Sequence, residues 1–212
     1  MNDAGRSEAM ARPREFDEET ALEAAMQCFW RRGYEATSLR DLTVAMGLTP
    51  PSLYNTFGDK QQLFERSLER YLDRTTRDRL QRLEATLAPR EALEHFFAEI
   101  IGHSVQDRQR KGCFLVNSAL EIAPHDARCR AMIAAQFAGI EGFFRRCISA
   151  GQDDGSISKA IDPDDVARLF LSTLLGIRVM ARTNPDREVL KGLARPAMAL
   201  LGKPQVKRKR KR

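Results

Sequence analysis

The stretch from Ser38 to Lys60 constrains the fold more than any other, because it carries the start and stop signals of two short helices in close succession. Ser38 and Asp41 have the spacing of a capping box, and Gly47 stands where the first helix should end. Thr49 can cap a second helix that opens on two prolines, which a first helical turn tolerates. Two helices joined by so short a turn form a helix-turn-helix.

The second of these helices has two distinct faces. Leu53 and Phe57 recur at i and i+4, so both are expected to point into a core. The remaining faces carry hydroxyl and amide groups suited to phosphate oxygens and base edges in DNA. These groups belong to Ser52, Tyr54, Asn55 and Thr56.

A longer set of residues surrounds the motif, from about residue 16 to residue 71. It comprises Phe29, Gly33-Tyr34 and Thr37-Ser38, then Ala45-Met46-Gly47-Leu48, and finally Ser52-Leu53-Tyr54, Phe57, Lys60 and Leu63-Phe64. In these residues the chain resembles the TetR/AcrR family of bacterial transcriptional regulators. The resemblance implies a sequence-specific DNA-binding regulator, usually a repressor, and not an enzyme.

The resemblance also implies, position by position, which residues contact DNA. Pro50, Pro51 and Ser52, with their cap Thr49, begin the recognition helix where bases are usually read, although a proline offers only apolar contact. Arg40 could read a guanine as a bidentate donor, and its alternative role is a surface ion pair. The implied phosphate contacts are Thr37, Ser38, Tyr54, Thr56 and Lys60, and Thr56 departs from the Tyr or His that is more usual in the family.

The rest of the chain shows helical periods and no alternating strand pattern, so the predicted fold is all-α with about nine helices. An N-terminal three-helix domain should precede a larger helical bundle. We expect a flexible arm at residues 1–15, a DNA-binding domain at 16–72, a ligand-binding and dimerisation domain at 73–201 and a basic disordered tail at 202–212.

Several helix limits can be read from capping residues. Asp17 and Gly33 should bound the first helix, and Asp59 should begin a helix that charged residues extend to the Ala88-Pro89 pair. A later helix is expected over residues 126–150, followed by a turn over residues 151–158.

The last two helices carry more apolar residues than one core needs. The resemblance implies that they pair with their symmetry mates, so that a homodimer binds a palindromic operator in double-stranded DNA. The alternative is additional burial within one subunit. The apolar residues concerned include Leu171, Leu175, Ile177 and Val179.

The resemblance further implies that an unknown small-molecule effector binds within the helical body and changes the spacing of the two recognition helices. Apolar surfaces with a few polar groups suit such a site. The predicted lining residues are Phe97, Ile101, Cys113, Asn117, Glu121, Phe137 and Arg178.

Cys113 supports a separate hypothesis. It follows Lys111 and Gly112 at an expected helix start, where the helix dipole and the nearby cation favour thiolate, so it could sense electrophiles or oxidants. An inert buried thiol is the alternative. The four cysteines lie far apart without CxxC spacing and are expected to be reduced thiols.

Catalytic and cofactor motifs are missing from the sequence, which contains no GxGxxG, GxxxxGK[ST], HExxH or GxSxG. We therefore expect no cofactor. His95, Glu99 and His103 share a helix face at i, i+4 and i+8 and could hold a metal, but this face lies opposite the apolar stripe. A solvated polar face is the favoured interpretation, and no metal is predicted.

The formal net charge is +6 and the isoelectric point about 9.4, which suggests an acidic partner such as nucleic acid. Non-specific nucleic-acid binding through the C-terminal tail is thus a further alternative. No run of eighteen apolar residues or signal peptide occurs, so we expect a cytoplasmic protein without a membrane partner. The basic residues of the tail, Lys203, Lys207, Arg208, Lys209, Arg210, Lys211 and Arg212, exceed the whole net charge.

Overall fold

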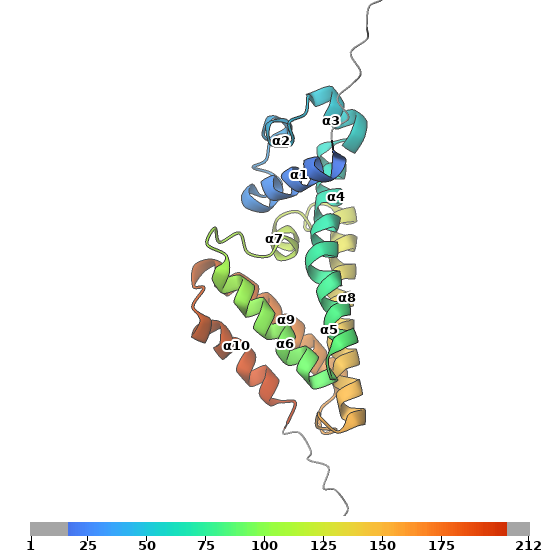
Figure 1. Ribbon diagram of the computed structural model, residues 1–212, viewed down its shortest axis with the longest axis vertical. Coiled ribbons are helices and arrows are strands. Elements are labelled where there is room, and N and C mark those ends of the chain that lie inside the picture. The colour runs from blue at the N-terminus through green and yellow to red at the C-terminus, as the bar shows by residue number, and fades with distance from the viewer. Residues whose placement is uncertain (1–16, 203–212) are drawn as a thin grey trace, which may run out of the picture.

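The computed structural model describes residues 17–202, which form ten α-helices and one π-helical turn without any strand (Figure 1). This confirms the all-α prediction. The arm at residues 1–15 and the basic residues from 203 onward lie outside the described part. In chain order the elements are α1 Glu18–Arg32, α2 Leu39–Met46, α3 Pro50–Phe57, α4 Lys60–Leu72, η1 Asp73–Arg77, α5 Asp78–Thr86, α6 Pro89–Gln106, α7 Phe114–Glu121, α8 Ala127–Asp154, α9 Pro163–Thr183 and α10 Arg187–Ala199.

The helix starts near the N-terminus are those that the capping residues predict. The Asp17 side chain accepts from the Glu19 N–H, and α1 ends at Gly33. Asp59 and Gln62 form a full capping box at the start of α4. Each cap satisfies an N–H group that has no partner within its own helix, which fixes where the helix begins.

Helices α4 and α5 form one long rod that runs from the N-terminal helices α1–α3 down the body beside α8 (Figure 1). The π-helical turn η1 interrupts this rod, and the Asp78 N–H bonds the Asp73 carbonyl five residues back. Counting the rod as one helix gives the nine helices expected from the sequence. The rod ends at Leu87, just before Ala88.

Aromatic rings fill the core of the helical body. In the body, α6, α8 and α9 bring Phe96, Phe97, Phe143, Phe144 and Phe170 into direct ring contact, with the Phe96 and Phe144 centroids 5.0 Å apart.

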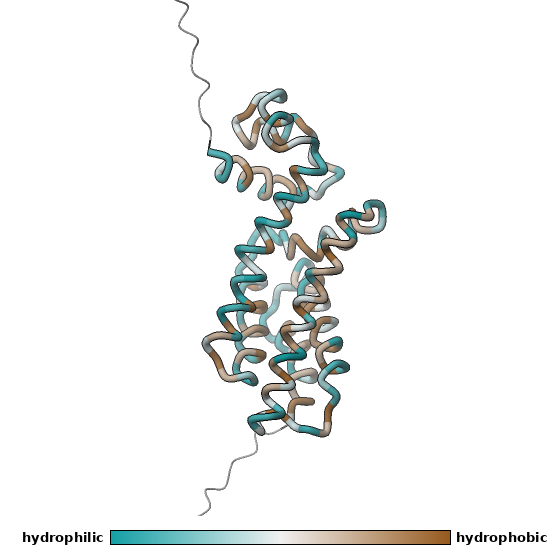
Figure 2. The backbone as a smooth tube through the Cα atoms, turned by 90° about the vertical axis from the view of Figure 1, so that its right-hand side faces the viewer, coloured by the Kyte–Doolittle hydropathy of each residue, from teal (hydrophilic) through white to brown (hydrophobic). Residues whose placement is uncertain are grey.

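Hydrophobic residues recur at intervals along each helix and alternate with hydrophilic ones (Figure 2). Accordingly, none of the helices described here is long and apolar enough to cross a membrane.

One helix end differs from the prediction. Helix α8 continues to Asp154, so part of the expected turn at residues 151–158 is helical, and Gly155 ends the helix in a left-handed conformation with φ +83°. Gly151 lies inside the helix because its missing side chain leaves room for Ile157, whose Cδ1 would be 2.5 Å from a Cβ at this position. The glycine marks a close packing contact, not a turn.

Gly151→Ala is therefore expected to destabilise the fold by about 1–3 kcal/mol, because Ile157 must shift within a packed core. Gly139→Ala is the matched control on the same helix, since a Cβ there meets nothing within 4 Å. It should stabilise by up to about 1 kcal/mol through helix propensity. Urea unfolding of both variants measures the effects, and equal changes in both would contradict the packing argument.

Candidate DNA interface and effector cavity

Helices α2 and α3 are joined by the tight turn that Gly47 allows, with φ +67° and an N–H that bonds the carbonyl of Thr43. Leu42 and Leu53 are fully buried between the helices and the rest of the domain. Because its apolar side faces inward, α3 presents its polar side at one end of the molecule (Figure 1). The helix-turn-helix prediction is confirmed.

Most of the residues predicted to contact DNA are accessible on this end. Tyr54 is 47% exposed. The hydroxyl groups of Ser52 and Thr49 lie 3.0 Å apart, and the Ser52 N–H bonds Thr49 Oγ1 at the start of α3. The exposed members of the predicted set are Ser38, Arg40, Thr49, Pro50, Pro51, Tyr54 and Asn55, and the half-buried ones are Ser52, Thr56 and Lys60.

Arg40 is exposed on α2, and its guanidinium makes no ion pair or hydrogen bond with any residue in the range 17–202. The neighbouring acid is engaged elsewhere, because Asp41 pairs with Arg32 and completes the capping box with Ser38. The Ser38 hydrogen bonds, supported by Arg32, lower the pKa of Asp41 to about 2. The alternative role of Arg40 in an ion pair is therefore not found within the described residues.

Two predicted phosphate contacts have partners inside the protein. Thr37 is completely buried, and its hydroxyl donates to the Gly33 carbonyl at 2.6 Å, so we omit it from the interface. Lys60 places its ammonium group 4.3 Å from the centre of the Tyr34 ring, a cation–π contact. That contact accounts for a lysine in the first turn of a helix, and Lys60 remains partly accessible.

A chain of aromatic rings joins the predicted DNA-reading domain, made of α1–α3 and the start of α4, to the helical body that follows. Phe64 of α4 lies edge-on to Phe29 of α1 at 5.2 Å and to Phe114 of α7 at 5.5 Å between ring centroids. Two helical turns farther along the rod, the Tyr71 ring contacts Phe114 and Trp30, with centroids 5.7 Å and 4.9 Å away. The two parts therefore share one hydrophobic core across α4.

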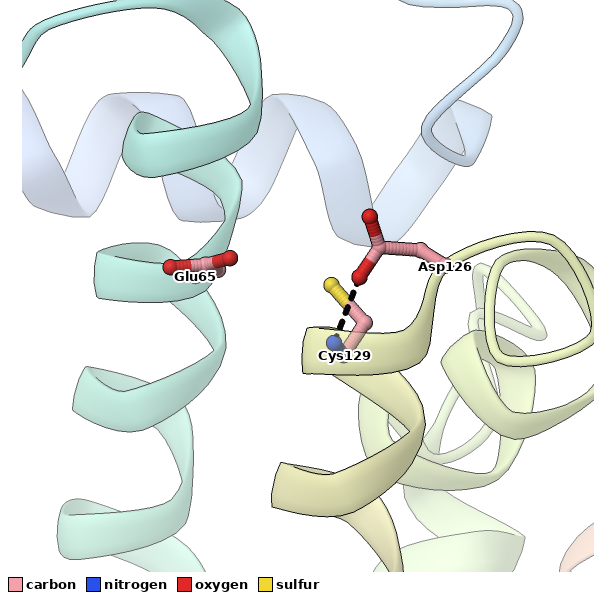
Figure 3. Close-up of side chains that lie close together, drawn as sticks. All are labelled: Glu65, Asp126 and Cys129. Carbon is pink, nitrogen blue, oxygen red and sulfur yellow. Dashed lines mark hydrogen bonds between the residues drawn. The ribbon is translucent and has the colours of Figure 1, made fainter.

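A polar cluster lies beside these rings, where α4 meets the start of α8 (Figure 3). Glu65, Asp126 and Cys129 bring potential ligand atoms within 4.8 Å of one another. Gln61 donates to Asp126 at 2.7 Å, and Arg128 pairs with Glu65 at 3.0 Å. Glu65 is 5% exposed, and its Oε1 has no hydrogen-bond partner within the described structure.

The cluster has the chemistry of a structural joint. Both oxygens of Asp126 already accept hydrogen bonds, one from the Cys129 N–H as the cap of α8 and one from Gln61. Burial, with Asp126 nearby, raises the pKa of Cys129 to about 12, so the thiol is protonated at neutral pH. These groups connect α4 to α8 through the protein's own contacts.

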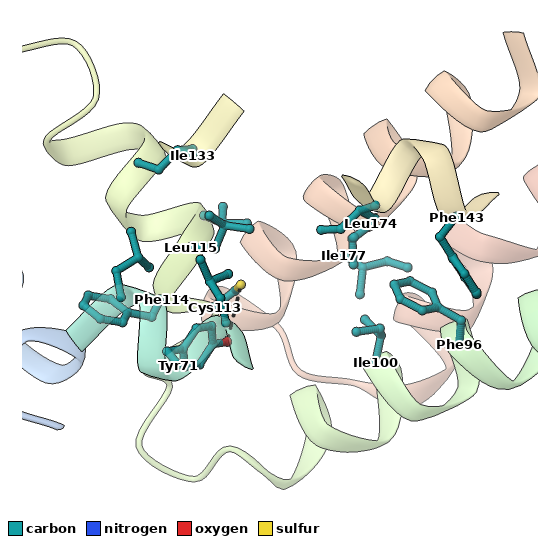
Figure 4. Packing of buried hydrophobic residues seen from close by; sticks show 14 of the residues in the cluster. Tyr71, Phe96, Ile100, Cys113, Phe114, Leu115, Ile133, Phe143, Leu174 and Ile177 are labelled. Carbon is teal, nitrogen blue, oxygen red and sulfur yellow. Dashed lines mark hydrogen bonds between the residues drawn. The ribbon is translucent and has the colours of Figure 1, made fainter. Parts of the chain in front are cut away.

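A cavity of about 310 Å³ opens between α1, η1, α6 and α9. A narrower apolar cleft adjoins it and reaches toward Phe96, Ile100 and Leu174 in the core (Figure 4). The cavity and the cleft share Tyr71, Thr75, Arg79 and Arg178. The cavity is further lined by Trp30, His103, Ser104, Gln106, Asp107, Lys111, Gly112 and Ala181.

The predicted effector residues separate into two groups. Arg178 lines both spaces, and Cys113 and Phe137 line the cleft. The other four have different positions. Phe97 and Ile101 are buried in the core, Asn117 donates to the Lys111 carbonyl, and Glu121 accepts from the Glu35 N–H in the DNA-reading domain.

Cys113 is the residue before α7, as predicted, and it is buried with 9% exposure. The Tyr71 hydroxyl lies 3.5 Å from its Sγ and donates to it (Figure 4). The thiol therefore lies at the inner end of the cleft, and its role as a sensor stays a prediction.

The polar face with His95, Glu99 and His103 is organised by arginines. Glu99 accepts from Arg79 at 3.1 Å and from Arg82 at 2.7 Å. This carboxylate thus joins α6 to the rod, and both of its oxygens accept hydrogen bonds from these arginines.

The cavity residues that sequence reasoning missed come from four parts of the chain, namely α1, the rod, the end of α6 with the loop after it, and α9. Trp30 and Tyr71 are apolar residues at helical spacing, and this pattern alone does not distinguish core from cavity wall. Lys111 lies over the Trp30 ring at 3.9 Å, and the Trp30 Nε1–H donates to the Gly112 carbonyl. The sequence places Lys111 beside Gly112 and Cys113, but it gives no sign that Lys111 contacts Trp30, which lies 81 residues earlier in the chain.

Comparisons with known proteins agree with this geometry. Residues 21–66 match the family described as bacterial regulatory proteins, tetR family, and residues 89–196 match the tetracyclin repressor-like C-terminal domain. The chain is 31% identical over 182 residues to the uncharacterized HTH-type transcriptional regulator YezE of Bacillus subtilis (strain 168), covering 85% of this chain and 94% of that protein. The chain belongs to the TetR family. It is a DNA-binding transcriptional regulator.

Other relatives of this TetR family member cover nearly its whole length. The HTH-type transcriptional repressor ComR of Escherichia coli (strain K12) is 30% identical, over 89% of this chain and 90% of that protein. A cysteine mutant of the TetR family transcriptional regulator CifR, solved with 26-bp double-strand operator DNA, has a TM-score of 0.80 and 34% identity. That match covers 90% of this chain and 100% of CifR.

The joint between α4 and α8 should make stability depend on pH. In the folded protein, burial raises the pKa of Glu65 above the usual 4.5 that it has in the unfolded chain. As the pH rises, the unfolded chain therefore loses this proton at a lower pH than the folded protein does. The protonated Glu65 side chain is therefore compatible with the fold at acid pH, and the free energy of unfolding falls as the pH rises from 4.5 through the pKa of the folded state. Glu65→Gln removes the titration, and the variant should gain stability relative to the parent as the pH rises from about 4 to 7.

Urea unfolding at several pH values measures this effect. Glu69→Gln, at an exposed position one turn along the same helix, is the matched control. A stability difference between Glu65→Gln and the parent that stays constant with pH, or changes in the opposite direction, would contradict the assignment.

Proposed function

We propose that the chain acts as a dimeric repressor that binds a palindromic operator through α3 and is released by a small-molecule effector. The observation that carries this proposal is the accessible polar face of α3, with Arg40 beside it and unpaired among residues 17–202, on a domain whose core continues into a body with a cavity. The regulator acts by binding rather than catalysis, and in the cytoplasm where its operator lies.

In the proposed complex, α3 enters the major groove. Arg40 offers a guanidinium whose forked N–H groups match the O6 and N7 acceptors of guanine. Tyr54 and Asn55, on the exposed face of α3, and Ser38 at the start of α2 supply contacts to phosphates and base edges. Pro50 and Pro51 contribute apolar surface only.

The dimer surface is formed by α9 and α10. Six of the nine large exposed hydrophobic residues in the described chain lie on or at the end of these two helices, which pack against each other within the subunit. Ile177, expected in this surface from the sequence, is instead fully buried, and Leu171 and Leu175 are partly buried against the core. The six exposed residues are Leu169, Val179, Met180, Val189, Leu193 and Leu200.

The cavity is placed to influence DNA binding. Its wall between α6 and α7 is fixed to α1 by the Trp30–Gly112 hydrogen bond of 3.1 Å and by a Lys111–Gln27 hydrogen bond of 3.1 Å. The same wall is held to α9 by Arg182, which donates to the Arg110 carbonyl. An effector that binds better to one spacing of these elements shifts the equilibrium between DNA-competent and DNA-incompetent dimers.

Arg40→Ala should reduce discrimination between operator and random duplex by about 1–3 kcal/mol, because a base-specific contact is lost. Tyr54→Ala is the comparison variant, and it should weaken binding to both duplexes alike because its hydroxyl contacts phosphate. Fluorescence anisotropy with the upstream promoter region and a scrambled duplex provides both affinities. Equal losses on the two duplexes for Arg40→Ala would exclude base reading by this residue.

Val179→Glu should dissociate the dimer, because it places a charge in an apolar interface that has no partner for it. Val179 is 46% exposed within the subunit, so the variant subunit should still fold. Sedimentation velocity measures the oligomeric state. Leu120→Glu, at a position 69% exposed on α7, is the control and should leave the dimer intact.

A further inference from the structure

The cavity beside Trp30 has an excess of positive charge. Three of its lining residues, Arg79, Lys111 and Arg178, are cationic, and Asp107 is the single carboxylate among the described residues that line it. Asp107 is already engaged, because its Oδ2 accepts from the Gly112 N–H at 2.8 Å. The cavity therefore has more cationic groups than the protein itself neutralises.

Arg178 is the least satisfied of these cations. It is partly buried on α9, and its one hydrogen bond within the described residues runs from Nη1 to the Ser104 hydroxyl at 3.3 Å. No carboxylate in that part of the chain lies within ion-pairing distance of it. A guanidinium has five N–H donors, so most of its donors are left for a ligand.

The neighbouring groups increase the preference for an anion. Arg79 is partly buried, with 13% of its side chain exposed, and it shares Glu99 with Arg82, so two arginines pair with one carboxylate. Burial and the charge of Arg178 lower the pKa of Arg79. Burial and the charges of Arg79 and Arg178 likewise lower the pKa of His103. An anion here would relieve repulsion between cations that the fold holds together.

The remaining walls are apolar or weakly polar. Trp30 and Tyr71 supply aromatic surface, and the adjoining cleft leads to Ile100 and Leu174 (Figure 4). Thr75 of the π-helical turn places a hydroxyl group in the wall, and this hydroxyl donates its hydrogen bond to the Tyr71 carbonyl at 2.6 Å. The ligand that matches these walls has one anionic group and a compact apolar body.

We propose that this cavity binds an organic carboxylate, with its carboxylate on the Arg178 guanidinium and its apolar body against Trp30 and Tyr71. The inference rests on the effector function proposed above and assigns the chemical class of the effector. Arg178 is then the specificity residue, because the planar guanidinium matches a carboxylate with two parallel hydrogen bonds. Arg79 and Lys111 add charge around it.

The single tryptophan of the chain, Trp30, lines the cavity and serves as the reporter. Three probes with the same phenylpropyl skeleton differ in the charge of their end group: 3-phenylpropanoate, 3-phenylpropan-1-ol and 3-phenylpropylamine. Each is titrated into the full-length protein while indole fluorescence is excited at the red edge of its absorption, where the phenyl group is transparent. The carboxylate should bind about tenfold or more tightly than the alcohol, and the amine most weakly.

Arg178→Gln should abolish the preference for the carboxylate while leaving the affinity for the alcohol nearly unchanged. Arg168→Gln is the matched control, because Arg168 lies on the same helix, is exposed, and pairs with Asp165 and Glu141 away from the cavity. If Arg178→Gln does not fold by circular dichroism, Arg178→Lys replaces it. That variant keeps the charge without the fork and should show an intermediate preference.

The proposal is overturned if the three probes bind equally, if the alcohol or amine binds best, or if the carboxylate does not bind up to about 10 mM, the range expected of so small a ligand. It is equally overturned if Arg178→Gln retains the preference. These titrations contain no DNA. Anisotropy with promoter DNA is measured separately, so a failure to bind operator would count against the proposed regulatory function and not against the carboxylate site.

Discussion

The structure depends on the packing of α4 against aromatic rings on both of its sides. Phe64 and Tyr71 contact Phe29 and Trp30 of the DNA-reading domain, and both also contact Phe114 of the body. Edge-to-face rings at these distances add to the free energy gained by burying them. Because such a core is close-packed, the two parts cannot rotate past each other without losing these contacts.

Charged groups reinforce the same joint from the surface. Arg70 of α4, whose side chain is only 10% exposed, pairs with Glu19 and Glu23 of α1. Arg66, one turn earlier, donates to the Thr56 carbonyl near the end of α3 and thereby supports the recognition helix. The rod and the recognition helix are therefore joined by a direct hydrogen bond, whereas Tyr54 and Asn55 of α3 are exposed.

Much of the fold could be predicted from the sequence, and the reasons are local. Ser38 with Asp41, Thr49 and Asp59 determine helix starts through contacts within three residues. Long-range packing decided where prediction failed. Gly151 looked like a turn residue until Ile157 was found against it, and Thr37 looked accessible although its hydroxyl bonds Gly33. The helix-turn-helix followed from short-range pattern, but the cavity did not, because its walls come from four segments far apart in the chain.

The π-helical turn has a consequence for how the chain tolerates insertions and deletions. A bond from residue i to residue i+5 encloses one residue more than the ordinary helical turn, so the rod carries a single surplus residue between its two halves. Deleting one residue from Asp73–Arg77 would restore regular helix and leave the two halves in nearly the same rotational phase, because the wider turn absorbs the surplus residue. Related sequences that lack this residue can therefore keep the same angle between the two parts, with an unbroken helix in place of the wider turn.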